Sequence, residues 1–313
     1  METFKDKIVV VTGGAGFVGS HIVDALVERG ARVRVIDDLS TGKIENLAHI
    51  IERIEFVKDS ILNDQALAAI FKDADVVYHE AAVPSVPKSL KDPLTSHEAN
   101  ATGTLKVLLN ARDAKVKRVI YAGSSSYYGD TPTLPKHEGM PPNPLSPYGL
   151  QKYVSEAYMQ QFAKYFGMET IGLRYFNVYG PRQNPESEYA AVIPRFIKLM
   201  KHGQKPKVFG DGTATRGYTY ISDAVAANML AFDATGVSGE IFNVAGEGQT
   251  SVNELIALIN KVLGTSIEAE YTPNRPGDIK HSYADLTKSR RMLGYEPKVS
   301  LEEGLRLTKE SIS

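Results

Sequence analysis

The feature that most constrains the fold is a glycine-rich turn that joins a buried strand to a helix near the amino terminus. Residues 7–12 are mostly β-branched and apolar, as is typical of a buried strand. They run directly into Gly13-Gly14-Ala15-Gly16-Phe17-Val18-Gly19, and the helical pattern that follows stops near Gly30. A turn without side chains and a helix amino terminus together suit a pyrophosphate, because the helix end offers free N–H groups and a positive dipole. The sequence therefore predicts a dinucleotide-binding α/β unit.

A second predicted strand, residues 32–36, ends in Asp37-Asp38. A carboxylate at that strand end, 24 residues after Gly13, can bind both hydroxyls of a ribose and repels a 2′-phosphate. This pair favours NAD over NADP.

Strand and helix patterns alternate through the first half of the chain. Strands are predicted at 7–12, 32–36, 54–57, 75–79, 118–123 and 169–174, and helices at 19–29, 64–72, 102–114 and 148–166. Such alternation predicts the α/β class, with right-handed crossovers and a Rossmann-type doubly wound parallel sheet.

After Tyr175 the pattern breaks into shorter pieces rich in Gly, Pro and Asn, which predicts a smaller, mixed α/β substrate-binding lobe. A last strand near 240–244 is expected to return to the sheet, so the two domains interleave. The predicted NAD-binding domain is 1–174 plus 218–246, and the predicted substrate-binding lobe is 175–217 plus 247–313.

Composition excludes several classes of function. The 313 residues, 42% hydrophobic and 23% charged, are ordinary for a globular enzyme, and a formal net charge of −1 argues against nucleic acid or a membrane as partner. With no cysteine there is no disulfide, thiol catalysis or Cys-ligated zinc, and the seven scattered histidines predict no metal site. We expect no signal segment, no membrane span and a cytoplasmic location.

Tyr148 and Lys152 form the main catalytic candidate. Ser146-Pro147 is a good helix opening, and positions four apart on a helix share one face. A nearby cation favours the phenolate and lowers the tyrosine pKa from about 10 toward working pH, which makes a general acid/base for a sugar or alcohol hydroxyl. By itself the pair is also typical of exposed helix residues, and the glycine turn is what favours the catalytic interpretation.

The whole set of motifs resembles the extended short-chain dehydrogenase/reductase family, from Lys7 to about Pro297. His79-Glu80-Ala81-Ala82 resembles its H-x-A-A strand end, and Ser124-Ser125-Ser126 before Tyr128-Gly129 resembles its serine segment. The resemblance implies Ser124, Tyr148 and Lys152 as catalytic residues and NAD as cofactor. It implies cofactor contacts from Gly13, Gly16, Phe17, Val18, Gly19, Asp37, Asp38, Leu39, Ser40, Thr41, Gly42, Asp59, Ser60, Ala81, Ala82, Asn100, Tyr148, Lys152, Tyr175 and Phe176.

Motifs in the carboxy-terminal half imply a UDP-sugar substrate. The segment 174–183 is similar to the family's L-R-Y-F-N-V-Y-G-P-R-Q run, in which Phe176 would lie near the nicotinamide and Asn177 would bind the diphosphate. An aromatic ring at Phe209 suits a flat uracil ring. The implied substrate contacts are Ser125, Ser126, Asn177, Val192, Val208, Phe209, two diphosphate-binding arginines (Arg216 and Arg275), the ribose-binding Asp278, and Ser282.

The resemblance implies NAD-dependent 4-epimerisation, in which Tyr148 takes the 4-hydroxyl proton while hydride leaves C4. Ser125 and Ser126 stand where 4,6-dehydratases carry Asp-Glu, and no cysteine or glutamate serves the other branches. A small Ser282, where some 4-epimerases have tyrosine, leaves room for a 2-acetamido group. We therefore expect UDP-N-acetylglucosamine, and UDP-glucose beside it, as substrates.

Three alternatives remain open at this point. The chain could be specific for UDP-glucose, it could act on UDP-glucuronate because Arg182 could meet a carboxylate, or it could be a non-catalytic NAD-binding regulatory protein. The resemblance also predicts a homodimer through the helices 102–114 and 148–166, which would form a four-helix bundle.

Overall fold

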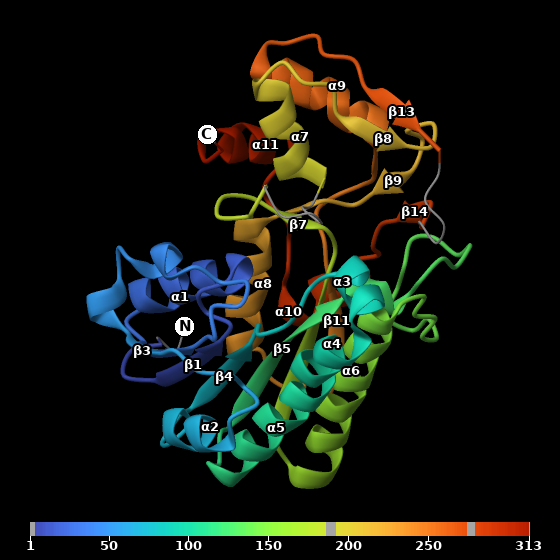
Figure 1. The fold of residues 1–313 in the computed structure, drawn as a ribbon. Coiled ribbons are helices and arrows are strands. Elements are labelled where there is room, and N and C mark those ends of the chain that lie inside the picture. The colour runs from blue at the N-terminus through green and yellow to red at the C-terminus, as the bar shows by residue number, and fades with distance from the viewer. Residues whose placement is uncertain (1–3, 186–191, 274–278, 313) are drawn as a thin grey trace.

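The computed structural model describes residues 4–185, 192–273 and 279–312. The chain forms a large α/β body with a smaller lobe above the carboxyl ends of its strands (Figure 1). Two predicted substrate residues, Arg275 and Asp278, lie outside the described residues.

A seven-stranded parallel sheet runs through the large body in the order β11-β6-β5-β4-β1-β2-β3. The strands are β1 (Ile8–Thr12), β2 (Arg32–Ile36), β3 (Glu55–Val57), β4 (Val76–His79), β5 (Arg118–Ser124), β6 (Glu169–Tyr175) and β11 (Glu240–Val244). All seven were predicted within one or two residues, and the doubly wound sheet is confirmed.

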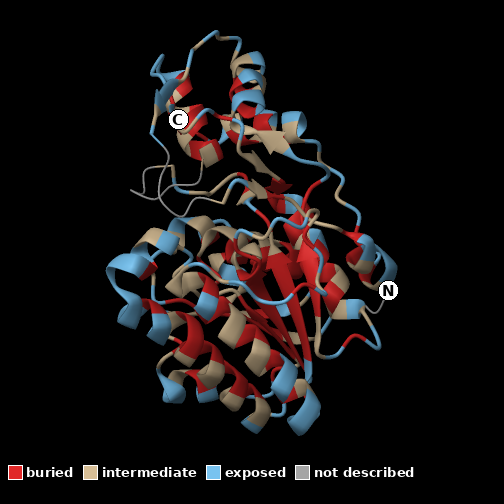
Figure 2. Cartoon of the chain, turned by 90° about the vertical axis from the view of Figure 1, so that its right-hand side faces the viewer, coloured by how far each residue is buried: buried red, intermediate tan, exposed pale blue. Residues whose placement is uncertain are grey.

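Helices cover both faces of this sheet because its strands alternate apolar side chains between two cores. Val9 and Val11 pack with α1 (Phe17–Glu28) and α8 (Ile221–Asp233). Val10 packs on the other face with α2 (Asp64–Ile70), α5 (Gly103–Asp113) and α6 (Pro147–Phe166). The strands between the two helix layers are buried almost throughout (Figure 2), so the loops at their carboxyl ends start from a rigid base.

Residues between β4 and α5 form helices that the sequence analysis did not predict. They are α3 (Val86–Lys91), α4 (Pro93–His97) and a π-helical stretch, Glu98–Thr102. Ser85 and Asp92 cap the first two: the side chain of Ser85 accepts a hydrogen bond from the Lys88 N–H, and that of Asp92 from the Thr95 N–H. Both helices pack against α6.

The lobe has its own apolar core. Its elements are β7 (Val178–Tyr179), α7 (Val192–Lys201), β8 (Lys207–Phe209), β9 (Thr215–Arg216), β10 (Thr219–Tyr220), β12 (Thr250–Ser251), α9 (Val252–Leu263), β13 (Glu270–Thr272), β14 (His281–Ser282) and α11 (Leu301–Glu310). Phe196, Leu255 and Leu305 from three of its helices meet in this core. One later helix, α10 (Thr287–Leu293), packs instead on β11 and α8 of the large body.

Short 3₁₀ turns cover Ile44–Leu47, Ile51–Arg53 and Ser125–Tyr127. Within the described ranges, no helix combines the length and apolarity that a membrane crossing needs.

Candidate active site

The glycine turn lies where β1, β4 and α1 approach most closely. Gly13 has a φ of +71°, and a Cβ there would stand 2.6 Å from the backbone Cα of Ala81. A Cβ on Gly19 would come within 2.2 Å of the Gly13 carbonyl oxygen. Neither place admits a side chain without moving backbone, so the glycines are required by the geometry.

The first turn of α1 is open to an anion. Gly16 precedes the helix without a side-chain cap, and the first turn contains no acidic residue. Phe17 and Val18 begin the helix and pack toward the lobe core, so this helix end lies at the junction of body and lobe. A close-packed cradle without side chains and an uncapped helix end fit the pyrophosphate of a dinucleotide.

Asp37 ties the loop after β2 to the glycine turn. Its carboxylate accepts hydrogen bonds from the backbone N–H groups of Ala15 (2.9 Å) and Leu39 (2.8 Å). A Cβ on Gly42 would lie 2.9 Å from the same carboxylate. Burial raises the pKa of Asp37, and these N–H groups partly offset the rise.

Asp38 is exposed and accepts a hydrogen bond from the Ser40 N–H at 2.8 Å. Thr41 completes this loop. The structure thus brings residues 37–42 to the glycine turn, and their contacts with ribose stay a prediction.

The other predicted cofactor residues follow the neighbouring strands. Asp59, after β3, accepts hydrogen bonds from the Ser60 N–H and the Asn63 side chain. After β4, the Ala81 N–H donates to the Thr12 hydroxyl at 3.3 Å. Ala82 comes next. Every one of these segments begins at the carboxyl end of a strand, which is where open α/β sheets bind ligands.

Asn100 is buried in the π-helical stretch and holds the loop after β4. Its side chain accepts a hydrogen bond from the Val83 N–H at 2.8 Å. Its backbone carbonyl accepts one from the Ser155 hydroxyl of α6 at 2.8 Å. This residue therefore connects the loop after β4 to the helix that carries Tyr148.

His79 is fully buried and bridges two threonines. One ring nitrogen lies 2.7 Å from the Thr12 hydroxyl and the other lies 2.9 Å from the Thr104 hydroxyl. Burial lowers the pKa of His79 to about 3, with Lys152 adding to the effect. A neutral imidazole thus links β1, β4 and α5 as a structural bridge.

Ser124 and Tyr148 meet at the carboxyl end of β5. Ser124 is the last residue of that strand, and its hydroxyl accepts a hydrogen bond from the Ser126 N–H at 3.2 Å. Tyr148 lies in the first turn of α6, which Ser146 caps and Pro147 opens, as predicted. The Tyr148 N–H donates to the buried Ser89 hydroxyl of α3 at 3.1 Å. This anchor was missed because α3 was not predicted.

Lys152 lies one helical turn further on and is buried. Its ammonium donates to the Ala122 carbonyl of β5 at 2.8 Å and lies 4.9 Å from the ring centre of Tyr121. Burial lowers the pKa of Lys152 to about 8, while Glu80 raises it.

The expected effect of Lys152 on Tyr148 needs correction. Burial raises the pKa of the Tyr148 phenol, and a hydrogen bond with Ser124 partly opposes the rise. The ammonium is aimed at β5 instead of the phenol, so helical spacing predicted the shared face but not the direction of the shift. In this structure Tyr148 is therefore a neutral phenol that lies beside Ser124.

Tyr175 joins a polar chain that the sequence analysis missed. Its hydroxyl donates to the Glu80 carboxylate at 3.0 Å and accepts a hydrogen bond from the Asn228 side chain at 2.6 Å. Glu80 occupies the variable place of the H-x-A-A motif, so the motif itself gave no signal of this contact.

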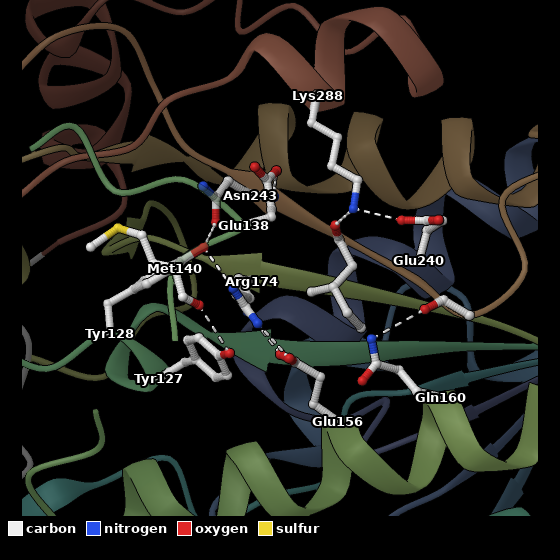
Figure 3. Close-up of polar contacts among 12 residues, drawn as sticks. Tyr127, Tyr128, Glu138, Met140, Glu156, Gln160, Arg174, Glu240, Asn243 and Lys288 are labelled. Carbon is white, nitrogen blue, oxygen red and sulfur yellow. Dashed lines mark hydrogen bonds and ion pairs between the residues drawn. The ribbon is translucent and has the colours of Figure 1, made fainter. Parts of the chain in front are cut away.

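Behind the site lies a buried ion pair, shown in Figure 3. Arg174 of β6 makes two hydrogen bonds to Glu156 of α6, at 2.8 and 2.5 Å, and a third to the Tyr128 hydroxyl at 2.7 Å. Tyr128 in turn donates to Asn243 of β11 at 2.7 Å. The pair fixes α6 and the turn after Ser124 on the sheet.

Phe176 is fully buried and packs near Tyr128, with ring centroids 6.0 Å apart. The expected nicotinamide contact therefore finds no exposed ring surface. The β-strand ending at Tyr175 turns this side chain into the core of the large body.

The polar substrate candidates that the structure describes in and beside the lobe are Arg216, Ser282 and Asn177. Arg216 on β9 and Ser282 on β14 lie in adjacent parallel strands, and the Arg216 guanidinium donates to the carbonyls of Ile279 and Lys280. Asn177 is exposed, has a φ of +40°, and donates to the Gly217 carbonyl at 2.8 Å.

The apolar candidates of the lobe are Val192, Val208 and Phe209. Val208 is buried in the lobe core, so it offers no open surface, whereas Phe209 and Val192 are half-buried. Ser125 and Ser126 are half-buried in the turn after β5.

The model of the NAD dependent epimerase/dehydratase family matches residues 9–245. The chain belongs to this family. NAD is accordingly its cofactor, and the family match agrees with the cradle at the glycine turn.

Relatives within the family are named for different UDP-sugar substrates. The chain is 39% identical over 306 residues to "UDP-glucose 4-epimerase" of Mycolicibacterium smegmatis, covering 96% of this chain and 97% of that protein.

Two solved structures are also similar. The UDP-N-acetylglucosamine 4-epimerase from Methanobrevibacter ruminantium M1, in complex with UDP-N-acetylmuramic acid, has a TM-score of 0.94 and 40% identity, with 98% of each chain covered. The UDP-glucuronic acid 4-epimerase from Bacillus cereus, in complex with UDP-glucuronic acid and NAD, has a TM-score of 0.91 and 35% identity, covering 97% and 98% of the two chains.

Proposed function

We propose that this chain is a UDP-sugar 4-epimerase that uses Ser124, Tyr148 and Lys152 for proton transfer and positioning. The observation that carries the proposal is that the first turn of α6, which contains Tyr148, packs on the turn that begins at Ser124: a Cβ on Gly149 would stand 2.9 Å from the Ser126 carbonyl oxygen. The glycine turn, which suits a dinucleotide, lies at the same carboxyl ends of the strands. The relatives, named as 4-epimerases of three different UDP-sugars, support the reaction and leave the sugar to be decided.

Tyr148 removes the proton from the sugar 4-hydroxyl and later returns it to the 4-keto oxygen. Ser124 hydrogen-bonds the same oxygen and fixes its place beside the phenol. NAD, when bound, would supply the hydride acceptor and donor for C4 of the sugar, so that no net oxidation results. Lys152 would hold the cofactor ribose and would add positive charge beside the phenol.

The residues that would hold NAD are those of the glycine turn and of the loops after β2, β3 and β4. Gly13, Gly16 and Gly19 let the pyrophosphate approach the backbone at the start of α1. Asp37 and Asp38 would accept hydrogen bonds from the ribose hydroxyls.

We further propose that the pocket accepts a 2-acetamido sugar as well as an unsubstituted one. Ser282 supports this reading because it is small and stands on β14 next to Arg216. Its side chain leaves volume that a tyrosine would fill, although added room does not by itself reject UDP-glucose.

The glucuronate alternative stands beside this proposal. One terminal nitrogen of the Arg182 guanidinium pairs with Asp24 of α1 at 2.7 Å, and the other is buried without a hydrogen-bond partner among the described residues.

The test is an NMR assay of the purified chain with UDP-N-acetylglucosamine, UDP-glucose and UDP-glucuronate in separate tubes, without added reductant. Conversion of the first two to their C4 epimers is expected. Conversion of UDP-glucose or of UDP-glucuronate only would overturn the acetamido assignment, and conversion of none would favour a non-catalytic protein. A Ser282→Tyr variant should lose acetamido-sugar turnover selectively. Equal loss on both sugars would remove Ser282 from substrate selection.

We also propose a homodimer through the face of α5 and α6. Exposed leucines gather beside this face: Leu90 of α3 is 64% exposed, Leu94 of α4 is 68% exposed and Leu150 of α6 is 51% exposed. The helices α3 and α4 pack against α6, so these leucines are exposed on neighbouring helices, and we propose that they join the interface. Light scattering should give twice the chain mass, and Leu94→Glu with Leu150→Glu should give the monomer.

A further inference from the structure

Asn243 of β11 is a fully buried polar residue for which the catalytic roles above have no use. It lies in one row across the sheet with the residue before Ser124, because Arg174 pairs with Gly123 on one side and with Asn243 on the other. At this edge strand the Asn243 N–H donates to the Glu138 carboxylate at 2.8 Å. The side chain makes three further hydrogen bonds. A buried amide that is bonded through both its oxygen and its nitrogen connects the segments it reaches rigidly.

The side-chain oxygen of Asn243 holds the turn after Ser124. The Tyr128 hydroxyl donates to this oxygen at 2.7 Å, and Arg174 donates to the same hydroxyl at 2.7 Å (Figure 3). Because a guanidinium can only donate, the hydroxyl proton is directed to Asn243. The 3₁₀ turn Ser125–Tyr127 begins after Ser124 and ends at Tyr128. The turn that begins at the catalytic serine is therefore fixed at its far end by Asn243.

The side-chain nitrogen of Asn243 reaches the chain beside Ser282. It donates to the backbone carbonyls of Lys136 and Asp285 at 2.9 and 3.2 Å, and since carbonyls only accept, the orientation of the amide is fixed. The same two segments pair through their backbones. The Lys136 N–H donates to the Tyr283 carbonyl at 2.9 Å, and the Asp285 N–H donates to the Lys136 carbonyl at 2.8 Å. Tyr283 directly follows Ser282, the last residue of β14. The nitrogen thus ties the strand of Ser282 to the loop that follows the catalytic turn.

We propose that Asn243 is a positioning residue that holds the turn after Ser124 and the strand of Ser282 in one fixed arrangement. The proposal rests on the proposed function, in which Ser124 binds the reacting oxygen of the sugar and Ser282 borders its 2-substituent. The two ends of the amide serve different purposes. Loss of the bond to Tyr128 should lower turnover of every sugar, whereas loss of the bonds made by the nitrogen should change the choice between sugars.

Tyr128→Phe tests the first end, because it keeps the ring and removes the hydroxyl. With the full chain saturated with NAD, kcat for UDP-N-acetylglucosamine and for UDP-glucose should both fall about tenfold, as expected for a displaced catalytic group, while KM stays nearly the same. Tyr295→Phe is the matched control: this tyrosine is also buried, but its hydroxyl donates to the Ala245 carbonyl at 2.9 Å. The control should keep the wild-type kcat. An unchanged kcat in Tyr128→Phe, or an equal loss in both variants, would contradict the proposal.

Asn243→Asp tests the second end. It keeps an oxygen for the Tyr128 hydroxyl and replaces the nitrogen by a second oxygen, which as a carboxylate cannot donate to the two carbonyls. The ratio of kcat/KM for UDP-N-acetylglucosamine to that for UDP-glucose should fall about tenfold, since the larger 2-substituent depends more on the place of Ser282. In the control Asn260→Asp, which removes a bond from α9 to the Ile267 carbonyl, the ratio should stay as in the wild type. An unchanged ratio in Asn243→Asp would overturn the proposal. If this variant does not fold, Asn243→Ser, whose side chain is too short to reach both carbonyls, takes its place.

Hydrogen–deuterium exchange followed by mass spectrometry tests the positioning without a substrate. In Asn243→Asp, peptides that cover 124–143 and 279–287 should exchange about tenfold faster than in the wild type, and Asn260→Asp should change neither. Wild-type exchange in both segments would refute the proposed connection. If the wild-type chain converts no UDP-sugar, the proposed function fails, and the exchange still decides whether Asn243 holds the two segments together.

Discussion

Removing the charge of Glu156 should destabilise the chain strongly, because it leaves Arg174 buried without its counter-ion. The side chains of Arg174 and Glu156 are 3% and 5% exposed, and they share two hydrogen bonds of 2.8 and 2.5 Å. At an effective dielectric constant near 20, two unit charges about 4 Å apart attract by about 4 kcal/mol. Breaking such a buried pair from one side typically costs about 3–5 kcal/mol. We expect Glu156→Gln to lower the free energy of unfolding by about that amount.

Urea unfolding followed by circular dichroism measures this loss, and two further variants calibrate it. Glu303→Gln removes a carboxylate from an exposed pair with Arg306, whose side chains are 51% and 47% exposed, and it should cost less than about 1 kcal/mol. A double replacement of Glu156 and Arg174 by methionine removes both buried charges and should recover most of the loss. If Glu156→Gln costs no more than Glu303→Gln, the ion pair does not hold α6 to the sheet.

Three further predictions concern the site. Gly19→Ala places a Cβ 2.2 Å from the Gly13 carbonyl oxygen. The affinity for the cofactor, measured by NADH fluorescence, should therefore weaken at least tenfold, whereas Gly139→Ala should bind the cofactor normally. Because burial lowers the pKa of His79 from 6.5 to about 3, the unfolded state binds more protons below pH 6.5. Protonation of His79 in the unfolded state should therefore lower the free energy of unfolding by about 2 kcal/mol between pH 7 and pH 5. Urea unfolding of His79→Asn should show a correspondingly smaller fall over the same pH range. Tyr148→Phe should keep NAD binding and lose about 10²–10⁴-fold in turnover, and wild-type rates would remove the phenol from proton transfer.

The sheet could be predicted from the sequence because each strand carries its own signal. Runs such as 7–12 and 118–123 are apolar and β-branched, and strands of a parallel sheet are buried on both faces. The glycine turn was predicted for the same local reason: close approach of backbone leaves no alternative to glycine at Gly13 and Gly19.

What the sequence did not reveal depends on contacts between distant segments. The helices α3 and α4 are six and five residues long, which is too short for a helical pattern of apolar residues to be recognised. Their capping residues, Ser85 and Asp92, were nevertheless visible in the sequence. The direction of the Tyr148 pKa shift depends on burial and on where the Lys152 ammonium points. The contact between Glu80 and Tyr175 joins residues 95 positions apart, so only the fold brings them together.

The central claim is that hydride leaves C4 of the sugar and returns to the same carbon. The most direct measurement is NMR of the products formed from UDP-N-acetylglucosamine labelled with deuterium at C4, in ordinary water. We expect UDP-N-acetylgalactosamine with the deuterium still at C4, because bound NAD would return to this carbon the hydride taken from it. Epimer that carries hydrogen from water at C4 would contradict transient oxidation, and the absence of any epimer would contradict the assignment of this chain as an acetamido-sugar epimerase.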